Sequence, residues 1–376
     1  MTNSKARKVL IVGGGIGGLT AAIALRQVGI EVDLVELKAE WSVYGVGIIQ
    51  QGNVVREMAR LGIADQCLSH GYSFDQVRIC NAQGHPLTVI PGKRLAGDAF
   101  PANMALPRID LHNILLDKAS RLGAQIELGV TVESFEQKSD SVSVCLTTGR
   151  VGDYDLLIGA DGIYSKIRAL LLGDQFKPAF TGQGGWRCNM PRFPEIDCLT
   201  VFRGERGGQA GFCPLKDNLM YMLQTTAEPG NPWFDPNELH TLFKERLAEF
   251  EGPIGRARDE FLTDPAQVIY KPFETIFMEQ WHAGRVLLIG DAVHATTPHL
   301  GQGAGMAIED AVVIAEELQA HPVDKALEHF MTRRFERCKF IVETSRQIGV
   351  WEMDRSLPAD FDGAVRRMLE VTAQPI

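Results

Sequence analysis

The sequence predicts an α/β protein with three parts: a Rossmann-like domain with a mostly parallel sheet, a second, α+β domain with a mostly antiparallel β-sheet, and C-terminal helices. The chain opens with an apolar run, a glycine-rich turn and a helical stretch. Two further apolar runs, one in mid-chain and one near residue 290, end at an aspartate beside a glycine. Between these two runs, proline, glycine and short β-type segments become frequent, which favours antiparallel strands.

The N-terminal unit has the order strand, helix, strand, at Lys8–Val12, Leu19–Val28 and Glu31–Glu36. Three glycines in its G-x-G-x-x-G turn have separate tasks. Gly13 permits the tight turn, Gly15 lets the backbone approach a pyrophosphate, and Gly18 lets helix and strand pack closely. The unit predicts a dinucleotide site, and the alternative is a glycine-rich packing turn.

Glu36 ends the second strand of this unit. There a carboxylate can accept hydrogen bonds from both hydroxyl groups of an adenosine ribose. Its negative charge would repel a 2′-phosphate, so the sequence disfavours bound NADP at this site.

Two distant segments share a second pattern, in which a buried strand ends at an aspartate. The strands end in Asp161-Gly162 and in Gly290-Asp291, and a helix follows each, the first with Ser165 as its expected cap. Ligands bind at this edge of open α/β sheets. Pro298 and a cluster of glycines precede the later helix, whose free N–H groups favour negative charge. The pattern favours one large shared cofactor over two independent strand–helix turns.

The remaining elements follow from periodicity and turn residues. We expect a hairpin of Phe74–Cys80 and Pro86–Ile90, then irregular chain from Gly92 to Pro107. Helices are expected at Asp110–Leu122, capped by Asp110, at Asn237–Phe250 and, the longest, at Lys325–Gly349. Further strands are expected at Gln125–Leu128, Val130–Gln137, Ser141–Thr147, Leu199–Phe202, Gln209–Pro214, Leu219–Gln224 and Gln267–Phe273.

Composition limits the functional classes. The 376 residues are 45% hydrophobic and 23% charged, as in soluble globular proteins. No apolar run approaches the roughly 18 residues of a membrane span, and no signal peptide is expected. A net charge of −9 without a basic cluster argues against nucleic-acid binding. Seven scattered cysteines predict reduced thiols in a cytoplasmic protein. Nine histidines without metal-ligand spacing predict no metal site.

Three motifs together resemble those of the class A flavoprotein monooxygenases, the aromatic hydroxylases related to p-hydroxybenzoate and salicylate hydroxylases. They are GGGIGG at the N-terminus, DLLIGADGIYSKIR in mid-chain and RVLLIGDAVHATTPHLGQG near the end. They stand in the family's order and span about residues 8 to 320, so the resemblance covers most of the chain. It implies FAD as the cofactor and NAD(P)H as a co-substrate that needs no second Rossmann motif.

The resemblance also implies a division of the chain. The FAD-binding domain would comprise residues 1–73, 104–176 and 278–322, and the substrate domain residues 74–103 and 177–277. Residues 323–376 would form the C-terminal helices.

The resemblance implies which residues contact FAD. Glu36 would bind the adenosine ribose, Arg108 the phosphate or ribityl region, and Asp291 a ribityl hydroxyl. The helix start near Gly301 would point at the isoalloxazine, whose anionic reduced form a helix N-terminus stabilises. The full implied set is Gly13, Gly15, Ile16, Gly18, Glu36, Leu37, Gly47, Arg108, Val130, Asp161, Asp291, Gly301, Gln302, Gly303 and Ala304.

The implied reaction begins with reduction of FAD by NAD(P)H. Oxygen then gives a flavin 4a-hydroperoxide, and its terminal oxygen is transferred to an electron-rich aromatic ring. Pro298 would line the oxygen pocket without bringing an N–H donor. The chain departs from the family at two places: Gly52-Asn53 replaces a frequent Pro-Asn, and Ile49 stands where several relatives have a phenol-activating histidine.

Four residues are candidates for the substrate chemistry: Arg187, Tyr221, Pro298 and His299. Arg187, in a Trp-Arg pair that resembles alkylquinolone hydroxylase-like members, could bind an anionic or phenolic oxygen or form a surface ion pair. Tyr221 could face the substrate or pack in the core. His299 could shuttle protons near neutral pH or be structural. Weaker candidates, with packing as the alternative, are Gln209, Phe212, Trp351 and Met353.

The sequence therefore predicts an FAD-dependent monooxygenase that uses NAD(P)H and O2 to hydroxylate a small aromatic or heteroaromatic substrate, as a monomer or homodimer. One alternative is an epoxidase or Baeyer–Villiger-type oxygenase on the same fold. Another is a flavin redox sensor or carrier, and a third is an NAD-dependent dehydrogenase that uses only the N-terminal unit.

Overall fold

A six-stranded, mostly parallel sheet forms the centre of the computed structural model, which describes residues 5–43, 45–205 and 207–376. Only its edge strand β18 runs antiparallel to its neighbour. The strands in spatial order are β18 (His282–Ala283), β19 (Val286–Leu288), β12 (Leu156–Gly159), β1 (Lys8–Val12), β2 (Glu31–Glu36) and β8 (Gln125–Leu128). The inner strands are mostly buried, and they share one apolar core with the helices and with Val132, Val142 and Val144 of a small antiparallel sheet.

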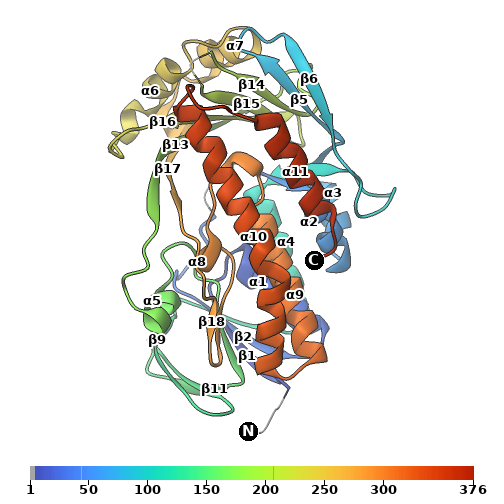
Figure 1. Cartoon of the computed structure of the whole chain (residues 1–376), viewed down its shortest axis with the longest axis vertical. Coiled ribbons are helices and arrows are strands. Elements are labelled where there is room, and N and C mark those ends of the chain that lie inside the picture. Colours follow the sequence, from blue (N-terminus) through green and yellow to red (C-terminus); the bar gives the residue numbers. More distant parts are fainter. Residues whose placement is uncertain (1–4, 44, 206) are drawn as a thin grey trace.

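The helices of this domain share the apolar core of the parallel sheet. The longest, α10, runs from this sheet to the second sheet at the other end of the molecule (Figure 1). The helices are α1 (Ile16–Gln27), α2 (Gly52–Arg60), α3 (Ala64–His70), α4 (Arg108–Arg121), α5 (Lys166–Leu172), α8 (Asp291–His294), α9 (Gly303–Ala320), α10 (Val323–Met353) and α11 (Phe361–Ala373).

A seven-stranded sheet forms the second structural unit, and only its β14–β5 pair is parallel. Its strands in spatial order are β17 (Val268–Thr275), β13 (Ala179–Pro191), β16 (Leu219–Ala227), β15 (Gln209–Pro214), β14 (Leu199–Arg203), β5 (Gln76–Asn81) and β6 (Pro86–Pro91). The long strands β13 and β17 extend back toward α5 and the first domain (Figure 1). The predicted fold class and the hairpin before residue 91 are confirmed.

The two faces of the seven-stranded sheet have different neighbours because side chains alternate along a strand. Trp186 and Phe212 lie in an apolar core with helices α6 (Leu239–Arg246) and α7 (Gly252–Phe261). Cys213 and Tyr221 lie in a separate apolar cluster on the opposite face. We call that opposite face the inner face. By the strand registers it carries Arg187, Gln209, Tyr221 and Thr225.

Two small sheets and three 3-10 turns complete the chain. The strands β3 (Gly47–Gln51), β7 (Asn103–Pro107) and β4 (Tyr72–Phe74) form one sheet, and β11 (Val151–Tyr154), β10 (Val142–Leu146) and β9 (Val132–Gln137) form the other. The turns are η1 (Pro236–Glu238), η2 (Pro265–Gln267) and η3 (Pro298–Leu300).

Several predicted boundaries are wrong. Helix α4 begins at Arg108 and its cap makes no side-chain hydrogen bond, so Asp110 lies in the first turn instead of capping the helix. The helix that was predicted to extend to Phe250 ends at Arg246. The prediction was too long because Leu247 and Phe250, which lie beyond the helix, keep the helical apolar spacing and pack in the second core. The irregular stretch before residue 107 contains β7, and α7 was not predicted. The predicted cap Ser165 is confirmed, since its Oγ accepts a hydrogen bond from the Arg168 N–H at 2.9 Å.

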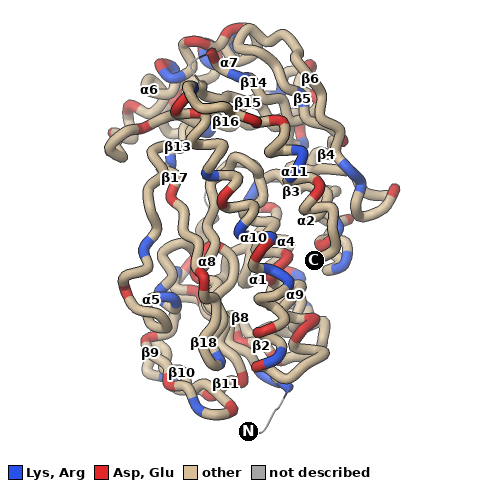
Figure 2. The backbone as a smooth tube through the Cα atoms, in the orientation of Figure 1, with Lys and Arg blue, Asp and Glu red and all other residues tan. Residues whose placement is uncertain are grey.

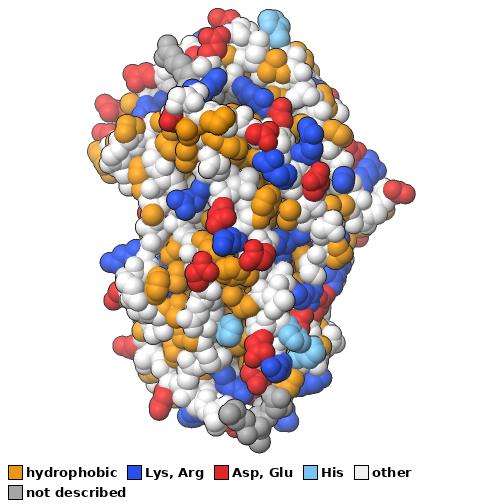
Figure 3. Space-filling model, in the orientation of Figure 1, with side chains coloured by type: hydrophobic (Ala, Val, Ile, Leu, Met, Phe, Trp, Pro, Cys, Tyr) orange, Lys and Arg blue, Asp and Glu red, His pale blue; other side chains and the backbone are white. Residues whose placement is uncertain are grey.

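Acidic and basic residues are distributed along the whole backbone (Figure 2). On the face shown in Figure 3, charged side chains of both signs lie among hydrophobic ones. Of the helices in the described part of the chain, none has the length and apolarity needed to cross a membrane. All seven cysteines are free thiols, and six of them are buried.

Candidate active site

The glycine-rich turn lies between β1 and α1 at the carboxyl edge of the parallel sheet. Gly13 has a φ of 109°, and a Cβ there would lie 2.4 Å from the Ala160 carbonyl oxygen. A Cβ on Gly18 would lie 1.9 Å from the Gly13 carbonyl oxygen, whereas one on Gly15 would meet nothing within 4 Å. Gly13 and Gly18 are therefore needed for the turn itself, and Gly15 leaves its backbone open to a ligand.

Glu36 lies at the end of β2 beside this turn. Its carboxylate accepts hydrogen bonds from the Gly14 N–H at 2.8 Å and from the Lys38 N–H at 3.0 Å. The backbone of Glu36 also holds the next crossover, because its carbonyl accepts from the Val130 N–H at 3.0 Å. Leu37, which follows, is 67% exposed. These hydrogen bonds fix the Glu36 carboxylate beside the exposed side chain of Leu37.

The two aspartate-bearing segments meet at one sheet edge, as the sequence predicted, because β12 and β19 are parallel neighbours. Arg168 joins the two segments: its guanidinium donates to the Ala292 carbonyl at 2.7 Å and to the Ile163 carbonyl at 2.9 Å. Asp161 is turned toward its own helix, since its carboxylate accepts from Ser165 Oγ at 2.6 Å and from the Ile167 N–H at 3.0 Å. Burial raises the pKa of Asp161 against these bonds.

Asp291 begins α8, and its side chain is open to solvent. The surrounding protein still raises the pKa of Asp291 by desolvation, against the opposing charges of His294 and Arg108. No hydrogen bond joins the Asp291 carboxylate, or the guanidinium of exposed Arg108, to another residue in the described ranges. Both groups are thus unsatisfied charges that face open space.

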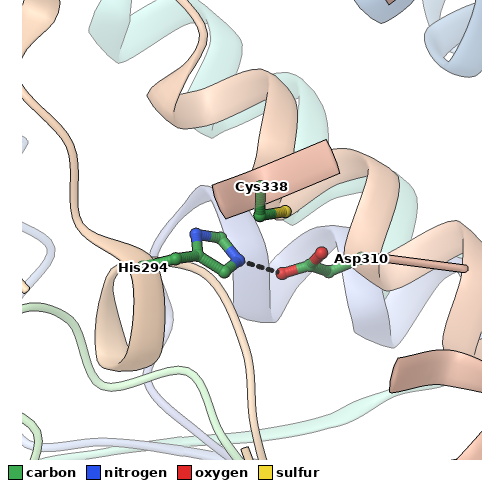
Figure 4. Close-up of side chains that lie close together, drawn as sticks. All are labelled: His294, Asp310 and Cys338. Atoms are coloured by element: carbon green, nitrogen blue, oxygen red, sulfur yellow. Dashed lines mark hydrogen bonds and ion pairs between the residues drawn. The ribbon is translucent and has the colours of Figure 1, made fainter. Parts of the chain in front are cut away.

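A buried group of His294, Asp310 and Cys338 supports the turn that carries Asp291 (Figure 4). Asp310 accepts from the Gly290 N–H at 3.0 Å and lies 2.6 Å from His294 Nε2. Burial opposes ionisation, but His294 and Arg334 hold the pKa of Asp310 at about 2. Cys338 and Asp310 raise the pKa of His294 well above its ordinary value despite its burial. Asp310 therefore fixes the Gly290 backbone through a hydrogen bond, and its ion pair with His294 holds the carboxylate in place.

The same three residues have the spacing of metal ligands, as do Glu317, His321 and His329 at the surface. In each group an arginine already uses a carboxylate oxygen: Arg334 donates to Asp310 at 2.9 Å and Arg333 to Glu317 at 2.7 Å. These guanidinium groups disfavour a cation, and the absence of a metal site stays a prediction.

The loop after α8 leads through η3 into α9. Gly301 has the left-handed conformation, with a φ of 64°, and Gln302 is the N-cap of the helix that begins at Gly303. The Gln302 side chain is anchored away from the loop, because it donates to Gln51 at 2.7 Å and to Asn53 at 3.1 Å. The first N–H groups of α9, at Gly303 and Ala304, have no intrahelical acceptor.

Tyr221 on the inner face packs against β3. A Cβ on Gly47 would lie 2.5 Å from a Tyr221 ring carbon, so this glycine is needed for the contact. Burial raises the pKa of Tyr221 well above its ordinary value. Tyr221 is thus a neutral, tightly packed phenol.

Arg187 is half-buried on the same inner face. Burial lowers the pKa of Arg187, with Tyr221 opposing and Arg108 adding to that effect. No hydrogen bond or ion pair holds its guanidinium to any residue in the part of the chain that the structure describes, so the surface ion pair considered as an alternative is wrong.

His299 and Gln209 both contact Glu352, a residue that the sequence did not single out. His299 Nε2 lies 3.2 Å from Glu352 Oε2, and Gln209 Nε2 donates to Glu352 Oε1 at 2.8 Å. Glu352 is 5% exposed. Its position on the apolar stripe of α10, with Ser345 and Ile348, is the signal that could have identified it, since an acid there must be buried.

The weaker candidates for substrate contacts lie in different parts of the structure. Phe212 is wrong as a substrate contact, because it lies in the core on the opposite face of the sheet. Trp351 packs on Phe361, with ring centroids 5.6 Å apart. Met353 lines a cavity of about 380 Å³ between the β13–β17 strands and α10.

Fold and geometry together define a dinucleotide-binding protein whose sheet edge faces a second, antiparallel domain. The profile of a family described as an FAD binding domain matches residues 6–344. A Bacillus subtilis (strain 168) protein, provisionally named FAD-dependent monooxygenase YetM, is 33% identical over 346 residues, covering 91% of this chain and 93% of that one. Aurachin C monooxygenase/isomerase of Stigmatella aurantiaca is 31% identical, over 97% of this chain and 98% of that one.

Solved structures agree with this assignment. Klebsiella pneumoniae HpxO, complexed with FAD and uric acid, superposes with a TM-score of 0.85 at 26% identity, over 98% of this chain and 97% of that one. The chain belongs to the FAD-binding-domain family and is a flavin-dependent monooxygenase of the aromatic hydroxylase type. FAD is its cofactor, as the sequence predicted.

Proposed function

We propose that this monooxygenase uses NAD(P)H and O2 to hydroxylate a small aromatic or heteroaromatic substrate that carries an anionic or phenolic oxygen. The observation that carries the proposal is the Arg187 guanidinium, which faces the inner side of the sheet without a partner among the described residues. An arginine in a half-buried position favours an anionic ligand, because its charge is otherwise uncompensated. Uric acid, which HpxO binds, is a heteroaromatic ligand of this size class.

The residues of the sheet edge fit FAD. Gly15 leaves room for a pyrophosphate, Arg108 offers a free cation, and Asp291 offers a free carboxylate for hydroxyl groups. We assign the adenosine ribose to Glu36 and the flavin ring to the segment from Pro298 to Ala304. When bound, FAD supplies the redox chemistry: it accepts two electrons from NAD(P)H and, after reaction with O2, transfers one oxygen atom to the substrate.

The protein's part in this proposal is to bind and orient. Arg187 holds the substrate's anionic oxygen, and Tyr221 supplies a neutral ring packed against the Gly47 backbone. Pro298 begins η3 and is exposed. It brings no N–H to the oxygen pocket, so it leaves the donors of the α9 N-terminus to act on the flavin.

The test uses purified protein with its bound flavin. Visible flavin absorbance and NADH or NADPH oxidation are measured with urate, phenols and N-heteroaromatic acids, and products are identified by mass. A product one oxygen atom heavier, formed with stimulated NAD(P)H oxidation, supports hydroxylation. Bound flavin without NAD(P)H oxidation that an aromatic compound stimulates would favour the sensor or carrier alternative. A ring-expanded product would favour a Baeyer–Villiger-type oxygenase, and an epoxide product an epoxidase.

Arg187→Ala provides the residue-level test. Loss of the charge should raise the substrate KM by about tenfold or more, since a hydrogen bond to a charged group contributes about 1.5–3 kcal/mol. Arg187→Lys, which keeps the charge but not the fork of donors, is the matched control and should retain part of the affinity. If the Arg187→Ala variant keeps the wild-type KM and still couples NAD(P)H oxidation to hydroxylation as the wild type does, Arg187 is not part of the substrate site.

A further inference from the structure

Glu352, near the C-terminal end of α10, collects hydrogen bonds from four side chains. Its Oε2 accepts from Gln183 Nε2 and from Thr225 Oγ1, both at 2.9 Å, and lies 3.2 Å from His299 Nε2. Its Oε1 accepts from Gln209 Nε2 at 2.8 Å. A buried carboxylate that receives this many donors is fixed in position.

The His299 ring is held at both nitrogens. Nε2 faces the Glu352 carboxylate, and Nδ1 lies 2.8 Å from Thr297 Oγ1. An ionised carboxylate only accepts hydrogen bonds, so we assign a proton to Nε2 of His299. Nδ1 then faces a hydroxyl group that can both donate and accept. Thr297, His299 and Glu352 thus form a continuous series of groups that can exchange protons.

The outer end of this series reaches the cavity of about 380 Å³. Thr297, Gln183 and Gly349 line that cavity, and exposed Arg346 and Lys177 also border it. The backbone of Gly349 is close to the imidazole, because a Cβ there would lie 3.1 Å from His299 Cε1. The inner end of the series is Glu352, which contacts Thr225 and Gln209 of the inner face.

We propose that Glu352 is a positioning residue for His299, and that Thr297, His299 and Glu352 carry a proton between the cavity and the inner face in each turnover. The proposal rests on the proposed function. Hydroxylation converts substrate, O2, NAD(P)H and one proton into hydroxylated product, NAD(P)⁺ and water, so one proton must be taken up. The electrons come from NAD(P)H and the series moves only the proton.

The transfer is balanced at each atom. Water in the cavity gives a proton to Thr297 Oγ as the hydroxyl proton moves to His299 Nδ1. The Nε2 proton moves to Glu352, which leaves the ring neutral and protonated at Nδ1. Glu352 then gives the proton, on the inner-face side, to the oxygen atom that leaves as water, which restores the anion. Rotation of the His299 ring toward the cavity, where Nε2 takes a proton from water and Nδ1 returns one, resets the series.

Two threonine variants separate transport from packing. Thr297→Val and Thr275→Val each remove one buried hydroxyl beside the same cavity, but only Thr297 contacts His299, whereas Thr275 donates to the Ala295 carbonyl. Thr297→Val should lower kcat by about tenfold or more, with unchanged KM and a larger solvent deuterium isotope effect on kcat. Thr275→Val should keep the wild-type isotope effect. Equal isotope effects in both variants would overturn the proposal.

His299→Ala and Glu352→Gln test the other two positions. Added imidazole can occupy the space left by His299, which adjoins the cavity, and should restore part of the lost kcat. Thr297→Ser, which retains the hydroxyl, should behave as wild type. Absence of imidazole rescue in a folded, flavin-loaded His299→Ala protein would count against proton transfer through the ring.

Ring ¹⁵N chemical shifts give a readout that does not depend on turnover. The His299 signal of the wild type should show a protonated Nε2, and Glu352→Gln should redistribute the proton between the two nitrogens. An unchanged signal would refute the positioning role. Protein without flavin, or without aromatic-stimulated NAD(P)H oxidation, would instead refute the proposed function. A wild type that hydroxylates its substrate, with variants that keep its kinetics, refutes only the proton series.

Discussion

Gly15 and Gly18 lie three residues apart in one turn, yet the structure predicts opposite consequences for replacing each with alanine. A Cβ on Gly18 would lie 1.9 Å from the Gly13 carbonyl oxygen and 3.4 Å from Ile11. Because the obstacle is backbone, it cannot rotate away. We expect Gly18→Ala to destabilise the protein by about 3 kcal/mol, the upper part of the range for overpacking.

Gly15→Ala should leave the stability nearly unchanged. Its φ of −77° suits any residue and its Cβ would meet nothing within 4 Å. The lower entropy of the unfolded chain favours alanine by about 0.4–1 kcal/mol, and the weaker N-cap preference of alanine offsets a similar amount. The added methyl group would, however, stand where the pyrophosphate approaches. Loss of one charge-assisted hydrogen bond corresponds to roughly 10- to 100-fold weaker FAD binding.

The two effects are measured separately. Urea unfolding of the flavin-free proteins reports stability, and titration with FAD reports affinity. The reasoning is refuted if flavin-free Gly15→Ala loses as much stability as Gly18→Ala, or if Gly15→Ala binds FAD as tightly as the wild type. The Gly18 variant alone would not decide, because a distorted turn weakens FAD binding as well.

The buried ion pair and the free carboxylate give three further predictions. Asp310→Asn should destabilise the protein by about 3–5 kcal/mol near neutral pH, because it leaves buried His294 without its carboxylate partner and Arg334 with Glu309 alone. The lowered pKa of Asp310 means that its contribution is present above about pH 4 and is lost as pH falls toward about 2, so urea unfolding at about pH 2.5 should show a much smaller difference. The raised pKa of His294 gives the opposite dependence of stability on pH. Its contribution to the free energy of unfolding is present below about pH 6.5 and is lost as the pH rises, so a wild-type stability that stays constant above that pH would contradict the prediction. Asp291→Ala should weaken FAD retention with little loss of flavin-free stability, and unchanged flavin occupancy after gel filtration would remove Asp291 from the site.

The sequence predicted those parts of the fold whose signals are local. The turn at Gly13 and the strands before Asp161 and Asp291 each carry their own pattern, and the structure has them at one sheet edge. The start of α4 was harder to predict from the sequence. Asp110 suggested a cap, but an acid inside the first turn interacts equally well with the helix dipole. The end of α6 was missed because Phe250 keeps the helical apolar spacing without helical backbone.

The candidate site could be predicted only where a residue lies on a motif. Arg187 was found through its neighbour Trp186, although the two face opposite sides of the sheet and only alternation along the strand tells them apart. Glu352 was missed because its partners are remote: Gln183 is 169 positions away in the chain. An acid on a long helix is ordinarily solvated, and the only local sign that this one is enclosed is its position on the stripe of Ser345 and Ile348.

The order of strands in the parallel sheet has a consequence for biosynthesis. The central strand β1 is made first, but one of its neighbours, β12, is made much later, and β19 later still, after nearly all of the second domain. Non-local pairing of this kind slows folding, because a long loop must close before its contacts form. On the ribosome, the N-terminal glycine turn thus emerges long before Ala160 and Gly290 can enclose it. We therefore expect FAD capture to follow synthesis of the second domain.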